Sequence, residues 1–182
     1  ALVDAGSQMP GLESWLPDIV RDELADGLSS LLYGAGLISW AWEARGGAYA
    51  RYVGQDQFRL FFERLRMAED CLQGVVRREP GNAAAWHHLV ITARGLELGL
   101  SEAQRRFEQA VAHHPGHLRA HQQMLQTTCA KWSGSHQQMH DFARTSMLGA
   151  PAGSPLGHLV ALAHIEEALS KAKYPKDIES YF

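Results

Sequence analysis

Apolar residues recur along the chain at the three- and four-residue spacing of amphipathic helices. The clearest run lies between about residues 56 and 78, where apolar side chains fall on one helical face. This apolar stripe consists of Phe58, Phe61, Phe62, Leu65, Ala68, Leu72, Val75 and Val76. Pro80, Gly81 and Asn82 follow it and predict a turn. No stretch alternates apolar and polar residues with a period of two, so we predict no strand.

Helical spacing of the same kind continues on both sides of this run. Toward the N-terminus we predict one helix that starts near Pro17 and is interrupted at Gly34 and Gly36, and a second that ends at Gly46. Toward the C-terminus, Ser101, Ser135 and Ser154 are predicted N-caps. We predict the remaining helices over about 83–98, 101–114, 118–132, 135–148 and 154–173.

Short links between these helices predict that neighbours pack as antiparallel pairs. We therefore expect an all-α fold, a short α-α superhelix of antiparallel helix hairpins with about eight helices. One helical-repeat domain should span residues 12–173. A flexible N-terminus at 1–11 is expected to precede it, and a C-terminal tail at 174–182 to follow it.

A shift of 35 residues brings several apolar positions and a proline into coincidence. The coinciding sets are Ala68, Leu72, Val75 and Pro80 with Ala103, Phe107, Ala110 and Pro115. A period of this length corresponds to one helix hairpin per repeat, and only the next hairpin can cover its apolar face. The clearest repeats fall within residues 56–150.

Residues 83–115 resemble the tetratricopeptide repeat. The resemblance rests on Trp86 and Leu89 in the first helix, Ala103, Phe107 and Ala110 in the second, and the closing Pro115. In the next unit His121 stands where that family has an aromatic residue. Two later segments, 131–144 and 151–169, also look like a bacterial tetratricopeptide-like family of unknown function. The resemblance covers roughly residues 56–169 and implies a right-handed array of hairpins.

The resemblance also implies where a partner would bind. In such arrays the first helix of each hairpin lines a concave face that accepts peptides. The corresponding residues here are His87, Ile91, Arg94, Arg119, Gln122 and Gln126. Guanidinium groups, amides and an imidazole suit a carboxylate or an extended peptide backbone. We therefore expect a non-enzymatic interaction scaffold whose partner is a protein or peptide.

Histidine pairs point to a different class of function. His117 and His121 are four residues apart, as are His136 and His140, so each pair shares one face of a helix and suits zinc. A metal-dependent enzyme, or a metal or pH sensor, built on these four histidines is the alternative hypothesis. The structural interpretation is stronger, because His117 follows a turn and His121 takes the place of a core aromatic residue. We accordingly predict no metal or other cofactor.

Composition and charge exclude some classes of function and indicate a cellular location. The 182 residues carry a formal net charge of −3 with histidine neutral, so we predict neither nucleic-acid nor membrane binding. Two cysteines, Cys71 and Cys129, indicate no disulfide framework and favour a reducing, cytoplasmic location. The sequence has no nucleophile elbow and no glycine-rich phosphate loop, which favours a protein that is not an enzyme. A structural domain of a larger protein that pairs as a homodimer is the third hypothesis.

Overall fold

The computed structural model describes residues 27–47, 50–112 and 114–171, together with the single positions 11, 14 and 18. The expected flexible N-terminus, the helix start near Pro17 and the expected tail otherwise lie outside these residues. Within the described ranges every regular element is a helix and there is no strand. The elements, with two short 3-10 helices written η, are α3 (Gly27–Arg45), η1 (Ala50–Tyr52), α4 (Gln55–Arg78), α5 (Ala83–Gly95), α6 (Leu100–Ala112), α7 (Leu118–Thr127), α8 (His136–Leu148), η2 (Pro155–Gly157) and α9 (His158–Lys171).

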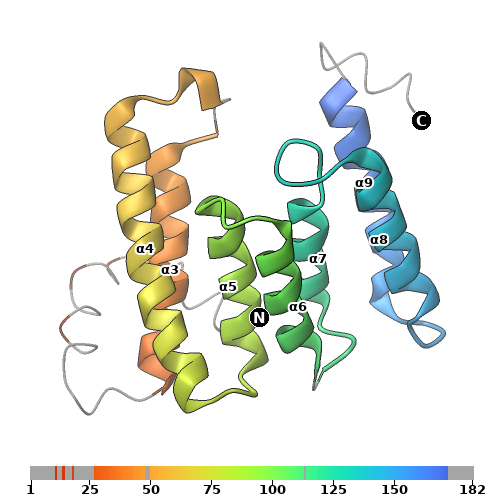
Figure 1. Ribbon diagram of the computed structural model, residues 1–182, viewed down its shortest axis with the longest axis horizontal. Coiled ribbons are helices and arrows are strands. Elements are labelled where there is room, and N and C mark those ends of the chain that lie inside the picture. The colour runs from red at the N-terminus through yellow and green to blue at the C-terminus, as the bar shows by residue number, and fades with distance from the viewer. Residues whose placement is uncertain are drawn as a thin grey trace.

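Sequential helices pack as hairpins along one row (Figure 1). Helix α3 packs on α4, α5 on α6, and α8 on α9. Helix α5 also packs against α3 and α7, so α5 lies between these two helices. The predicted all-α architecture of helix hairpins is therefore confirmed, with seven α-helices in the described part of the chain where about eight were expected for the whole.

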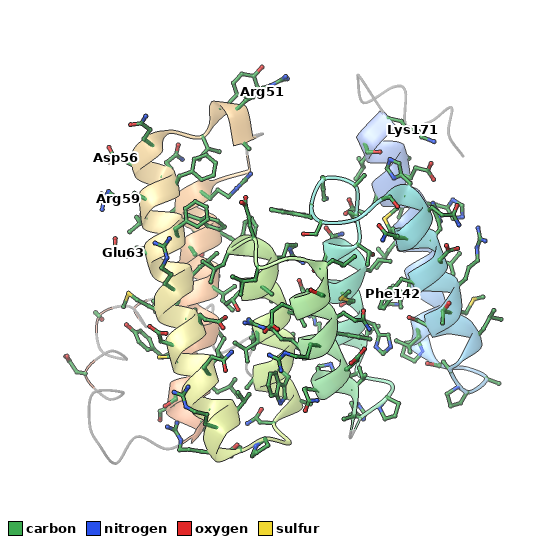
Figure 2. All side chains as sticks on the ribbon, viewed as in Figure 1. Arg51, Asp56, Arg59, Glu63, Phe142 and Lys171 are labelled. Carbon is green, nitrogen blue, oxygen red and sulfur yellow. The ribbon has the colours of Figure 1, made fainter. Side chains whose placement is uncertain are left out.

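The apolar stripe of α4 forms the middle of the hydrophobic core, as predicted. Its buried members are Phe61, Leu65, Ala68, Leu72, Val75 and Val76. This first core extends from α3 through α6 and reaches Met124 of α7. A second core begins one residue later, at Leu125, and joins α7 to α8, η2 and α9. Phe142 of α8 packs against both cores (Figure 2), so it bridges the two halves of the molecule.

The prediction that Gly34 and Gly36 interrupt a helix is wrong. Helix α3 runs without a break through both positions. A Cβ atom at Gly34 would lie 2.7 Å from Cγ of Leu72, which is fully buried in α4. Gly34 therefore serves the close packing of two helices and does not end one.

The helix predicted to run to residue 132 also ends early. Helix α7 stops at Thr127, and the backbone N–H of Ser133 donates to the carbonyl oxygen of Thr127 at 3.4 Å. A Cβ atom at Gly134 would clash with the carbonyl of Thr128. The glycine thus allows residues 128–135 to fold back on the end of α7. This loop, called the α7–α8 loop below, carries Trp132 and Lys131.

Several other helices begin close to the predicted positions, and polar side chains cap their N-termini. The side chain of Asn82 accepts from the N–H of Ala85 at 3.0 Å, and Ser135 accepts from Gln138 at 3.2 Å. Ser154 caps η2, which leads directly into α9. Helix α6 begins one residue before the predicted cap Ser101. Among the described helices, none has the length and apolar character needed to cross a membrane.

Candidate functional site

A cavity of about 940 Å³ opens where α3, α5 and α7 meet the α7–α8 loop. It is called the α3–α5–α7 cavity below. Each of these elements contributes at least one large polar or aromatic side chain to its wall. Those side chains are Trp42, Arg45, Arg94, Gln126, Lys131 and Trp132. Helices α3, α5 and α7 therefore line the cavity together.

Arg94 is held in one orientation at the wall of this cavity. Its Nη1 donates to the carbonyl oxygen of Gln123 at 3.1 Å, and its Nη2 donates to Oε1 of the same residue at 3.0 Å. The guanidinium carbon lies 5.9 Å from the ring centroid of Trp42 and 5.6 Å from that of Trp132, within reach of a cation–π interaction. Burial lowers the pKa of Arg94 to about 10, so the group stays cationic at neutral pH.

The two indoles that flank Arg94 also contact each other. The ring centroids of Trp42 and Trp132 are 5.6 Å apart with an interplanar angle of 87°, an edge-to-face arrangement. Arg45 also lies over Trp42, with its guanidinium carbon 5.6 Å from the ring centroid. The cavity thus combines flat apolar surface with positive charge.

Carboxylates at the rim balance part of this charge. Glu166 of α9 accepts from Gln126 Nε2 and from Lys131 Nζ, both at 2.6 Å. Glu97 lines the cavity from the turn after α5 and has a φ of 57°, in the left-handed region. This turn has the hydrogen bonds of a Schellman motif, in which glycine is the usual residue at that position.

Three of the six residues predicted for the binding face line the cavity, namely Ile91, Arg94 and Gln126. The other three lie outside its lining. His87 is only 4% exposed and packs against the rings of His88 and His117. Arg119 is exposed on α7. Gln122 is part-buried and hydrogen-bonds to His158 at 3.1 Å.

The residues that sequence reasoning missed come from two other places. Trp42 and Arg45 belong to the last turns of α3, and Trp132 and Lys131 belong to the α7–α8 loop. The resemblance assigned binding residues only to the first helices of two hairpins, so it did not reach either region. The two tryptophans were a usable signal, because tryptophan is enriched among the residues that contribute most to binding at interfaces.

The four histidines of the alternative hypothesis are not brought together as one group. His117 caps α7, where its Nδ1 accepts from the N–H of Ala120 at 3.1 Å. The ring of His121 packs edge-on against Phe107, with centroids 4.9 Å apart, as expected for a substitute of the core aromatic residue. Among the residues described, the group with metal-ligand spacing contains His140 but takes its other members from α9.

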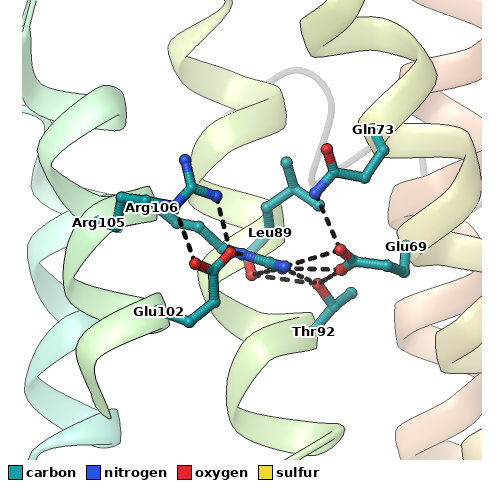
Figure 3. A network of polar contacts seen from close by, with 7 residues as sticks. All are labelled: Glu69, Gln73, Leu89, Thr92, Glu102, Arg105 and Arg106. Carbon is teal, nitrogen blue, oxygen red and sulfur yellow. Dashed lines mark hydrogen bonds and ion pairs between the residues drawn. The ribbon is translucent and has the colours of Figure 1, made fainter. Parts of the chain in front are cut away.

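A polar network that the sequence analysis did not predict is buried beside the first core (Figure 3). Arg106 of α6 is 3% exposed and pairs bidentately with Glu69 of α4, with both N–O distances 2.8 Å. Its Nη1 also donates to the carbonyl oxygen of Leu89, and its Nε donates to Glu102 at 2.6 Å. Helices α4, α5 and α6 are therefore tied together by one guanidinium group.

Electrostatic effects within this network act in opposite directions. Burial alone would raise the pKa of Glu69, but hydrogen bonds from Arg106 and Thr92 and the charge of Arg106 outweigh it and lower the pKa. Hydrogen bonds from Arg105 and Arg106 lower the pKa of Glu102 to about 2. Both carboxyl groups are therefore ionised at neutral pH. The network has the character of a structural tie rather than of a site that exchanges protons.

No family model matches the sequence, and no curated protein or solved structure matches it significantly.

Proposed function

We propose that the chain is a non-enzymatic binding module that takes a peptide or protein segment in the α3–α5–α7 cavity. The observation that carries this proposal is the composition of the cavity wall. It sets two indoles and a fixed guanidinium beside two further cations, Arg45 and Lys131. Such groups hold carboxylates and aromatic side chains, and none of them is arranged as a nucleophile with a base.

The charge of the wall favours an acidic segment. Arg45, Arg94 and Lys131 line the cavity, against the single carboxylate of Glu97 among its lining residues. Lys131 is paired with Glu166, and its side chain remains 51% accessible, so a ligand carboxylate can contact it from solvent. A segment with carboxylates near an aromatic residue would match both the cations and the flat indole faces.

The architecture supports the same proposal. We infer that residues 56–169 form a tetratricopeptide-like array, because residues 83–115 carry that pattern and α5 packs against both α6 and α7. We also place the protein in a reducing compartment, most simply the cytoplasm. Cys71 and Cys129 are free thiols in the structure, which suits such a compartment.

A selection from short random peptides displayed on phage tests the binding proposal, with affinities then measured by fluorescence polarisation of labelled peptides. We expect enrichment of sequences that combine acidic and aromatic residues. The double variant Arg45→Gln and Lys131→Gln should weaken their binding about ten-fold or more, because two charge-assisted contacts are lost.

The matched control is Arg119→Gln with Arg144→Gln, which removes two exposed cations that do not line the cavity. This control should bind the selected peptides as the wild type does, and both double variants should keep the wild-type melting temperature. Equal weakening in the two double variants, or selection of basic peptides, would argue against the cavity as the binding site.

A further inference from the structure

The α8–α9 hairpin brings two histidines and a glutamate together on one flank. Met139 of α8 and Ala163 of α9 are fully buried in the second core, which fixes how the two helices face each other. His140 follows Met139 directly and His164 follows Ala163. Glu167 lies three residues after His164, so these two side chains share a face of α9. The packing of the core thus determines the meeting of all three polar groups.

The spacing of their donor atoms is close to that of a metal site. One ligand atom from each of His140, His164 and Glu167 lies within 4.8 Å of the others. Nε2 of His140 is 2.7 Å from Oε2 of Glu167, and the two imidazole centroids are 4.7 Å apart. Tetrahedral zinc with bonds of about 2.0–2.1 Å holds its ligand atoms roughly 3.4 Å apart. Small side-chain rotations would therefore suffice for coordination.

Burial and charge distinguish this group from a chance meeting of surface side chains. The side chains of His140 and Glu167 are 12% and 16% accessible, whereas His164 is exposed. Lys171, near the end of α9 (Figure 2), donates to Oε1 of Glu167 at 2.5 Å. This contact holds one carboxylate oxygen and leaves Oε2 directed at the imidazoles. The exposed side of the group leaves room for water as a further ligand.

We propose that His140, His164 and Glu167 form a binding site for one divalent transition-metal ion, with zinc the best match. Two imidazole nitrogens with one carboxylate oxygen are a donor set that zinc uses in proteins. The site is independent of the proposed peptide binding, since none of its residues lines the α3–α5–α7 cavity. A bound ion would cross-link α8 to α9 and stabilise the end of the array.

Titration of the full chain with ZnCl₂ tests the proposal, using protein purified without a histidine tag and stripped with a chelator. Calorimetry should show saturable binding of one equivalent, and CoCl₂ should give the visible absorption of a low-coordinate cobalt site. His164→Ala and Glu167→Gln should each weaken Zn²⁺ binding at least about ten-fold. They should also reduce the rise in melting temperature that Zn²⁺ produces in the wild type.

A folding check and a control variant accompany the Zn²⁺ titration. His164 is exposed, so His164→Ala should fold normally, and circular dichroism checks this. His114→Ala removes an exposed imidazole from a distant turn and should bind Zn²⁺ as the wild type does. The proposal is overturned if the wild type binds no more Zn²⁺ than His164→Ala, or if His114→Ala loses as much affinity as His164→Ala. In that case His140 and Glu167 form an ordinary hydrogen bond.

Discussion

The guanidinium group of Arg106 lies in the interior because four residues satisfy it. Glu69 supplies both carboxylate oxygens, Leu89 a backbone carbonyl, Thr92 a hydroxyl and Glu102 a further carboxylate. Removing one member of such a buried pair leaves the other charge without compensation, which costs more than the intact pair contributes. The energetic importance of Arg106 therefore lies in its coupling to Glu69.

We predict that Arg106→Met destabilises the fold by about 3–5 kcal/mol, because Glu69 remains largely buried without its partner. The double variant Glu69→Met and Arg106→Met should be clearly more stable than the sum of the two single changes implies. Urea denaturation of all four proteins measures this coupling. Strict additivity would mean that the two side chains do not interact in solution.

His121 predicts a pH dependence of stability. Burial lowers the pKa of His121 below its ordinary 6.5, although its hydrogen bond to the carbonyl oxygen of His117 opposes this. Below about pH 6.5 the unfolded chain therefore binds a proton more readily than the native state, and stability is lost as the pH falls further. In His121→Phe, the midpoint of urea denaturation should therefore vary less with pH between about pH 7 and pH 5 than it does in the wild type.

At neutral pH the same substitution should be nearly neutral, since phenylalanine keeps the ring contact with Phe107. The stability of the variant should still depend on pH to some extent, because burial also lowers the pKa values of His87 and His117. An unchanged slope in His121→Phe would show that the imidazole titrates alike in the native and unfolded chains.

At the scale of the elements, α3 and α4 approach each other closely at Gly34. Alanine normally stabilises a helix interior by about 1 kcal/mol relative to glycine. At Gly34, however, the added methyl group would lie 2.7 Å from Cγ of Leu72, whose side chain is fully buried. Overpacking of this kind costs about 1–3 kcal/mol. The identity of this one residue sets the distance between two long helices.

We therefore predict that Gly34→Ala lowers the free energy of unfolding by about 1–2 kcal/mol, despite the better helix propensity of alanine. Gly74→Ala in α4 is the matched control. A Cβ atom there meets only the ends of arginine side chains, at 3.7 Å or more. It should raise stability by up to about 1 kcal/mol. Thermal unfolding of both variants distinguishes them, and a stabilising Gly34→Ala would contradict the packing argument.

Across the whole molecule, the positions of the helices could be predicted from neighbouring residues, whereas the packing between helices depends on residues that are far apart in the chain. The period of α4 and caps such as Ser135 are properties of a few neighbouring residues, so they were readable in sequence. The role of Gly34 depends on Leu72, and that of Arg106 on Glu69, which is a residue far away in the chain. Arg106 shares the buried face of α6 with Ala103 and Ala110, but helical spacing alone does not identify its partner.

The candidate site was predictable only in part for the same reason. Arg94 and Gln126 follow from their positions in the repeat, whereas Trp132 reaches the cavity through a loop whose path depends on Gly134. The assignment of homodimer formation stays a prediction. The molecule has two hydrophobic cores that meet at α7, whereas a regular repeat array would have one continuous core.

The contact between Trp42 and Trp132 has a practical consequence. The two indoles are 5.6 Å apart and nearly perpendicular, and Arg94 lies beside them, so we expect their absorption and emission to depend on this geometry. Entry of any molecule between them should change the near-ultraviolet circular dichroism and the fluorescence of the unlabelled chain. The protein therefore carries its own optical reporter, and occupancy of the cavity is open to measurement by spectroscopy before any partner is known.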